Sequence, residues 1–269
     1  MLFSVSAKAL STESVSQLST DRNELLFQAQ DHQFVLSINP NVSQLIYVSS
    51  AFTESIFTQS LGFGIEYGFT KSFSLSFFDD YGSATTKIAS FESTATGFSN
   101  YVFTAKSTYE VSSTSQLMLN FILGVSPGNT NSSNRYYGGN IYTPQIAFQR
   151  KYDESSTLSF KFDNTFYGPA TYDGGITTKG TFSSQFSCIF ETKKDDNKFG
   201  GQLGLTHYYT GGDFTNYLLL TSYASFNIKP NFRLMPMIGY TAPIDALTKK
   251  AGVKEDDLFS LQLNTRYAF

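Results

Sequence analysis

The sequence is poor in the residue types that disulfides, metal sites and soluble surfaces use. It contains one cysteine, Cys188, which excludes an internal disulfide and a cysteine metal site. Only two histidines are present, and the acidic pair Asp79-Asp80 lacks the spaced ligands of a calcium loop. We therefore expect no metal and no cofactor. Charged residues make up 15% of the chain, against about a quarter in a typical soluble domain.

Long hydrophobic runs are also missing. A transmembrane helix needs roughly 18 or more consecutive apolar residues, whereas runs such as Tyr217 to Leu220 span only a few positions. This excludes a helical membrane protein. The formal net charge is −3, and no basic cluster occurs, which argues against nucleic acid as a partner.

Aromatic residues, in contrast, are abundant. The 269 residues include 27 Phe and 17 Tyr, yet the mean hydropathy is slightly negative at −0.18. A transmembrane β-barrel combines these properties, because each strand presents one face to lipid and the other to a wet lumen. The composition therefore predicts two chemically different surfaces on the same strands.

Apolar and polar residues alternate with period two from about residue 33 to the last residue, which is the pattern of half-exposed strands. In the last segment Phe259, Leu261 and Leu263 share one face, whereas Gln262 and Arg266 share the other. An arginine fits such a strand because it points into the lumen. The alternation predicts an all-β protein.

The connections between these segments alternate in length, as in outer-membrane barrels with short turns on one side and longer loops on the other. Short connections are expected at 70–72, 112–114, 153–156, 193–198 and 229–231, and long ones at 81–97, 126–139, 168–176 and 244–257. With a first strand within residues 33–50, this gives about twelve strands. We predict a transmembrane antiparallel up-and-down β-barrel over residues 31–269, integral to the bacterial outer membrane.

Residues 1–30 form a separate N-terminal extension. The segment is polar and lacks alternation, and a short helix is expected around residues 13–26. Two interpretations remain open: the extension is a plug that folds into the lumen or across its periplasmic mouth, or it is a periplasmic tail.

The carboxyl end carries Leu263, Tyr267 and Phe269 on one face of the last strand. This arrangement resembles the terminal signal by which outer-membrane barrels are recognised for assembly, with an aromatic residue at the last position and another two residues earlier. The resemblance implies two partners, the outer-membrane lipid and the barrel assembly machinery.

The same alternation places a balanced set of charges inside the barrel. The candidate pore-lining residues are Glu66, Lys106, Glu110, Lys161, Asp163, Glu191, Arg233 and Arg266. Such a lumen contains either ion pairs that stiffen and narrow it or a channel without a steep preference for one ionic sign. Apolar residues are also predicted to point inward: Met118, Ile122, Ile189, Met235 and Met237. They suit a hydrophobic solute, or they fill the lumen themselves.

Two segments that are predicted to form hairpins resemble those of a known family. The segments Ile65–Leu75 and Phe226–Phe232, the second followed by Gly239-Tyr240, resemble turns of the outer-membrane proteins associated with the MetA pathway of phenol degradation. The resemblance implies a channel for small hydrophobic or aromatic compounds. It implies no particular binding residue.

Catalysis and surface recognition are the alternatives to a channel. His207 is predicted to face lipid, where an outer-membrane lipid hydrolase would need a serine two residues further on, but that position is Tyr209. Polar outer loops such as residues 130–137 would suit adhesion, and the barrel could also serve as a structural scaffold. We expect a channel for passive uptake of a small-molecule solute, not an enzyme.

Overall fold

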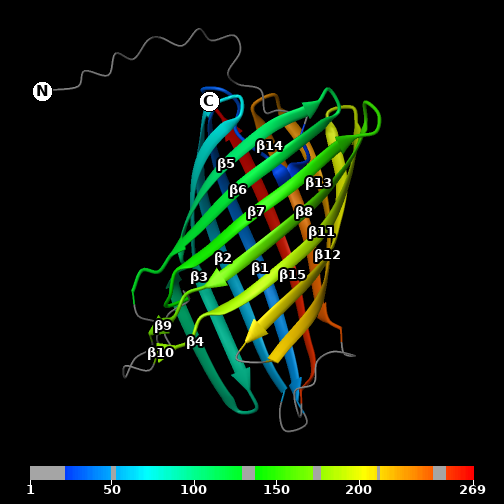
Figure 1. Cartoon of the computed structure of the whole chain (residues 1–269). Coiled ribbons are helices and arrows are strands. Elements are labelled where there is room, and N and C mark those ends of the chain that lie inside the picture. Colours follow the sequence, from blue (N-terminus) through cyan, green and yellow to red (C-terminus); the bar gives the residue numbers. More distant parts are fainter. Residues whose placement is uncertain (1–21, 50–52, 129–136, 172–176, 211–212, 245–252) are drawn as a thin grey trace, which may run out of the picture.

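The computed structural model of the chain is a closed barrel of twelve antiparallel strands with one extra strand (Figure 1). The structure describes residues 22–49, 53–128, 137–171, 177–210, 213–244 and 253–269. The barrel strands are β1 (Phe34–Ser49), β2 (Thr53–Thr70), β3 (Phe73–Ile88), β5 (Tyr101–Ser112), β6 (Ser115–Val125), β7 (Ile141–Lys151), β8 (Ser156–Tyr167), β11 (Thr181–Lys194), β12 (Asn197–Thr210), β13 (Asp213–Lys229), β14 (Phe232–Pro243) and β15 (Val253–Ala268). The predicted fold is confirmed.

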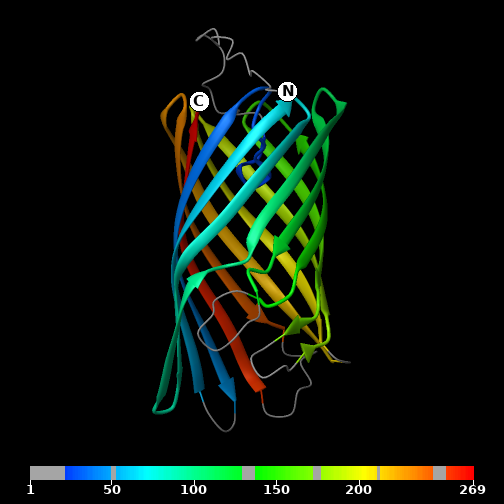
Figure 2. The ribbon, with the colours of Figure 1, turned by 90° about the vertical axis from the view of Figure 1, so that its left-hand side faces the viewer.

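The ring closes because β1 pairs with both β15 and β2, and β2 pairs in turn with β3. Strand β3 is shared between two partners. Its first part, Phe73–Phe78, pairs with β5, and its second part, Tyr81–Ile88, pairs with the extra strand β4 (Phe91–Phe98). The prediction of a long loop at 81–97 was wrong, because these Thr- and Ser-rich residues continue β3 into a hairpin (Figure 2).

Regular structure outside the barrel wall is sparse in the described residues. A 3₁₀ turn, η1 (Glu24–Leu26), precedes β1, and a two-stranded ladder joins β9 (Ala170–Thr171) to β10 (Thr177–Thr178). No helix among the described residues is long and apolar enough to cross a membrane. Most of the expected helix around residues 13–26 lies outside the described residues.

The two faces of the wall differ as the alternation predicts. Large apolar side chains such as Phe63, Phe103 and Leu203 remain about half exposed on the outer surface. Small polar side chains line the interior, and Ser74 and Ser187 are fully buried there. An apolar exterior of this kind suits lipid contact, because lipid tails cover it without displacing hydrogen bonds.

The two ends of the barrel also differ. At one end, which we call the turn end, β2–β3, β5–β6, β11–β12 and β13–β14 are each joined by two residues. The opposite end, the loop end, carries the longer connections after β6, β8 and β14 (Figure 1). The C-terminus lies at the turn end, where Phe269 N donates to Phe34 O at 2.9 Å.

We predict that a charge on the outer wall destabilises the barrel more than the same charge on the neighbouring inner position. Leu203→Arg, in the middle of β12, should lower the free energy of unfolding by about 2–4 kcal/mol, because the guanidinium meets lipid. Gln202→Arg faces the lumen and serves as the control. Urea unfolding in lipid vesicles measures both, and equal losses would contradict the assignment of faces.

Candidate functional site: the barrel lumen at the turn end

The segment that precedes β1 folds back into the barrel at the turn end (Figure 2). His32 N donates to Gly68 O at 2.8 Å, and Gly68 N donates to Gln33 O at 3.0 Å. A Cβ atom at Gly68 would lie 1.8 Å from Gln30 O. Only glycine therefore allows the segment to approach β2 this closely.

Apolar side chains of this segment pack against inward residues of the wall. Leu26 forms a buried cluster with Met118, Ala147 and Ile189, and Leu25 packs against it. Phe27 and Ala29 form a second cluster with Val35 and Ala268. Two of the inward apolar residues predicted from the sequence, Met118 and Ile189, thus contact the chain's own segment.

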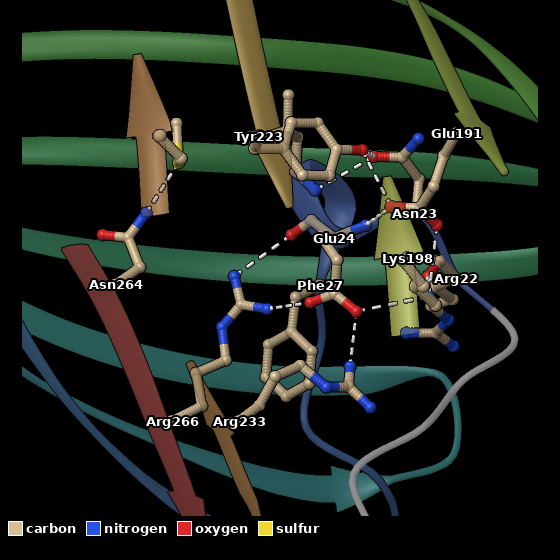
Figure 3. A network of polar contacts seen from close by, with 12 residues as sticks. Arg22, Asn23, Glu24, Phe27, Glu191, Lys198, Tyr223, Arg233, Asn264 and Arg266 are labelled. Atoms are coloured by element: carbon tan, nitrogen blue, oxygen red, sulfur yellow. Dashed lines mark hydrogen bonds and ion pairs between the residues drawn. The ribbon is translucent and has the colours of Figure 1, made fainter. Parts of the chain in front are cut away.

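The Glu24 carboxylate lies among three cations from three strands (Figure 3). Its Oε1 atom is 2.5 Å from Arg233 Nη1 and 3.3 Å from Lys198 Nζ, and its Oε2 atom is 2.6 Å from Arg266 Nη1. Glu24, Lys198 and Arg233 are at most 3% exposed. Each carboxylate oxygen therefore has a charged donor, in a place where water does not screen the attraction.

The backbone of the same segment is bound to residues of the consecutive strands β11, β12 and β13 of the wall. Glu24 N donates to Glu191 Oε2 at 2.9 Å, and the Tyr223 hydroxyl donates to the same oxygen at 2.8 Å. Lys198 Nζ lies 3.2 Å from Glu191 Oε1, so it bridges both carboxylates. Gly200 makes room for the Tyr223 ring, because a Cβ atom there would lie 2.4 Å from it.

A second ion pair holds the following residues. Lys106 Nζ lies 2.7 Å from Glu66 Oε2 and donates to Phe27 O at 2.9 Å. Glu66 Oε1 accepts from Ala29 N at 2.8 Å and from the Ser74 hydroxyl at 2.7 Å. Both networks therefore bind the backbone of the segment, and the first also binds its Glu24 side chain.

The environment of Glu24 favours its ionised form. Burial by itself raises the pKa of this carboxyl group, but the charges of Arg266, Lys198 and Arg233 outweigh burial and hold the pKa below its usual range. Glu24 is thus ionised at neutral pH, so its contacts with Lys198, Arg233 and Arg266 are ion pairs.

A cavity of about 280 Å³ lies in the lumen next to this segment. Glu24, Phe27 and Arg266 form part of its lining. Both apolar and polar wall residues complete it, among them Val35, Phe78, Met235, Met237, Asn39, Asn264 and Lys106. The Arg266 guanidinium lies 4.3 Å from the centre of the Phe27 ring, which places a cation beside an aromatic face at the cavity wall.

The structure divides the eight predicted pore-lining residues into groups. Glu191, Arg233 and Arg266 meet around Glu24, and Glu66 meets Lys106. Lys161 Nζ and Asp163 Oδ2 form a separate pair at 2.9 Å on β8. Glu110 is exposed near the turn end of β5. Their role in a pore remains a prediction.

Sequence reasoning missed Glu24, Lys198 and Tyr223. Glu24 lies in a segment without periodicity, and Lys198 falls at the edge of a connection that was predicted to be longer than it is. In the structure β12 begins at Asn197, so Lys198 shares the inward parity of Gln202. Extending the alternation by two residues would have identified Lys198.

The histidine considered for catalysis is hydrogen-bonded to an asparagine. His207 Nδ1 lies 2.9 Å from Asn216 Oδ1, and Ser184 is its cross-strand neighbour on β11. The Ser184 hydroxyl, however, donates to Asn164 Oδ1 at 2.7 Å. This hydroxyl is therefore engaged away from the imidazole, whereas an activated nucleophile would donate to its base.

Comparison with known proteins finds similarity in structure only. No family model matches the chain, and no curated protein matches it. The COG4313 outer membrane channel from Pseudomonas putida F1 superposes with a TM-score of 0.75 at 14% identity, covering 92% of this chain and 99% of that one.

Two further barrels match less closely. The TodX deltaS2S3 mutant, a monoaromatic hydrocarbon channel, has a TM-score of 0.53 at 8% identity over 91% of both chains. The translocator domain of the autotransporter NalP from Neisseria meningitidis has a TM-score of 0.58 at 11% identity, also over 91% of both chains. The chain therefore shares the fold of outer-membrane channels, as the sequence resemblance implied, at identities that carry no assignment of substrate.

Proposed function

We propose that this protein is a channel of the bacterial outer membrane for passive uptake of small solutes, closed at its periplasmic end by residues 22–30. The proposal rests on the structure of the lumen. A closed wall with an apolar exterior encloses a cavity that ends on Glu24 and Phe27. In this proposal the turn end faces the periplasm, as the short connections of outer-membrane barrels do.

Mixed chemistry of the cavity favours small hydrophobic or aromatic solutes. Phe78, Met235 and Met237 offer aromatic and thioether contacts, and Asn39 and Asn264 offer hydrogen bonds. Binding sites for small molecules combine apolar walls with a few polar groups in this way. The similarity in fold to a monoaromatic hydrocarbon channel supports the same class of solute.

The inward charges are proposed to line the route of the solute. Lys161 and Asp163 pair on β8, away from the segment that closes the lumen, and the charges around Glu24 line the closed end. Since each described cation among them faces at least one carboxylate, we infer that the closed lumen carries no strong excess of charge of either sign. We propose no catalytic role for any residue.

The last strand is proposed to carry the signal for the barrel assembly machinery. Leu263, Tyr267 and Phe269 belong to one face, and Tyr267 and Phe269 are 39% and 54% exposed. Their rings lie 4.6 Å apart between centroids. An exposed aromatic pair at the turn end offers a contact surface and suits the aromatic belt at a membrane boundary.

Planar-bilayer recording tests the proposed channel. We expect few conductance steps from the full chain and frequent steps from a form that lacks residues 1–30, because removal of the segment opens the turn end. Small aromatic solutes should block these steps. Heat-dependent migration in gel electrophoresis confirms folding of the shortened form. Absence of conductance steps from both folded forms would refute the proposed channel.

Closure should depend on pH through Glu24. A carboxyl group with a lowered pKa contributes docking energy fully above its ordinary pKa of about 4.3, and this contribution is lost as the pH falls through the lowered value. The open fraction of the full chain should therefore stay constant from about pH 7 to 5 and rise below about pH 4. Glu110→Gln, which removes an exposed carboxylate, should retain this rise. A flat profile would contradict the role of Glu24.

Deletion of Phe269 should impair assembly without changing the lumen. The amount of heat-modifiable barrel in outer-membrane fractions should fall severalfold, because the last strand loses its end aromatic. Phe91→Ala removes another exposed aromatic residue, from β4, and serves as the control. Equal amounts of barrel in all three forms would argue against an assembly signal.

A further inference from the structure

We propose that Lys198, Arg233 and Arg266 form a receptor for small carboxylates, in which Glu24 is a built-in ligand that a solute carboxylate displaces. The inference rests on the proposed channel and adds to it a class of solute, organic monocarboxylates with an apolar body, and a means of opening. It concerns the site in Figure 3.

Fixed cations on the wall are the basis of the receptor. Lys198 on β12, Arg233 on β14 and Arg266 on β15 belong to paired strands of the wall, so the positions of their backbones do not depend on the N-terminal segment. Glu191 is the wall carboxylate of this cluster, 3.2 Å from Lys198. Among the described residues of the wall, this cluster has three cations and one carboxylate, and this excess of positive charge favours the binding of an anion.

The arrangement of donors favours a carboxylate. Arg233 and Lys198 contact one oxygen of Glu24, and Arg266 contacts the other. Each oxygen of one carboxylate is thus met by its own charged donor, and charge-assisted hydrogen bonds of this kind are stronger than neutral ones. The Arg266 Nη2 atom donates in addition to Glu24 O at 3.1 Å.

The apolar surfaces beside the three cations determine what kind of solute can carry the bound carboxylate. When the segment leaves, Leu26 vacates its contacts with Met118 and Ile189, and Phe27 vacates its place beside Arg266. A solute with a carboxylate and an aromatic or branched apolar body would replace both kinds of contact. Benzoate is the simplest probe of this class.

Tethering determines the concentration at which a solute competes. Glu24 is part of the chain, and even a short flexible link would give a tethered ligand an effective concentration in the millimolar range. A free carboxylate must therefore reach at least about millimolar concentration before it displaces Glu24. This keeps the turn end closed in the absence of solute.

Trypsin cleavage after Arg22 measures release of the segment in the full-length protein. In the docked state Lys198 Nζ donates to Arg22 O, which shields this bond. Benzoate at millimolar concentration should raise the rate of cleavage severalfold, with a product that begins at Asn23. Benzyl alcohol has the same ring without the carboxylate and should have no effect. Equal rates with both compounds would overturn the proposal.

Conductance of the full chain supplies an independent test. Glu24→Gln should open the channel, raise its preference for anions over cations, and let benzoate bind at about tenfold lower concentration than the one that opens the wild-type channel, a difference of about 1.4 kcal/mol. Glu154→Gln removes the same charge from the exposed turn between β7 and β8 and should behave like wild type. Folding of each variant is checked by heat-dependent migration.

The outcomes distinguish a failure of the proposed receptor from a failure of the proposed channel. If removal of residues 1–30 opens the pore but Glu24→Gln changes neither opening nor selectivity, the receptor is refuted and the channel stands. If benzoate exposes Arg22 while every form remains silent in bilayers, the receptor stands and the channel is refuted. If Glu24→Gln does not fold, the trypsin experiment on the unaltered chain decides.

Discussion

Within the hydrocarbon layer of a membrane no water is available to the peptide groups, so each strand needs a hydrogen-bonding neighbour on both sides. The barrel satisfies this constraint by closing through β1, β2 and β3, with β3 shared between β5 and β4. Closure in turn forces every second side chain inward. The charges of the lumen, and the segment that meets them, follow from this ring.

Bringing charged residues into a confined lumen creates a need for partners, because a buried charge without a counter-ion is costly. Two solutions occur at the turn end. Glu66 and Lys106 pair with each other, whereas Lys198, Arg233 and Arg266 are contacted by Glu24 from outside the barrel strands, and Lys198 also by Glu191. The N-terminal segment is thereby part of the electrostatic structure of the lumen.

The solved barrels that resemble this chain share its fold at identities of 8–14%. Such divergence is expected of a fold that depends on alternation and turn length more than on particular side chains. Function depends on the site, and only the residues of the lumen distinguish one barrel of this kind from another. The cluster around Glu24 is accordingly where this protein's specificity is expected to lie.

Alternation in the sequence determined the all-β fold, the number of barrel strands and the inward faces of Glu66, Lys106 and Arg266, because period two assigns each residue of a strand to one face. It failed where contrast between the faces is weak, as in the β3–β4 hairpin. The alternation within a strand also does not predict which residues of other parts of the chain an inward side chain contacts. Arg266 meets Glu24 across 242 positions of the sequence, and only closure of the barrel, with the N-terminal segment folded inside it, brings these two charges together.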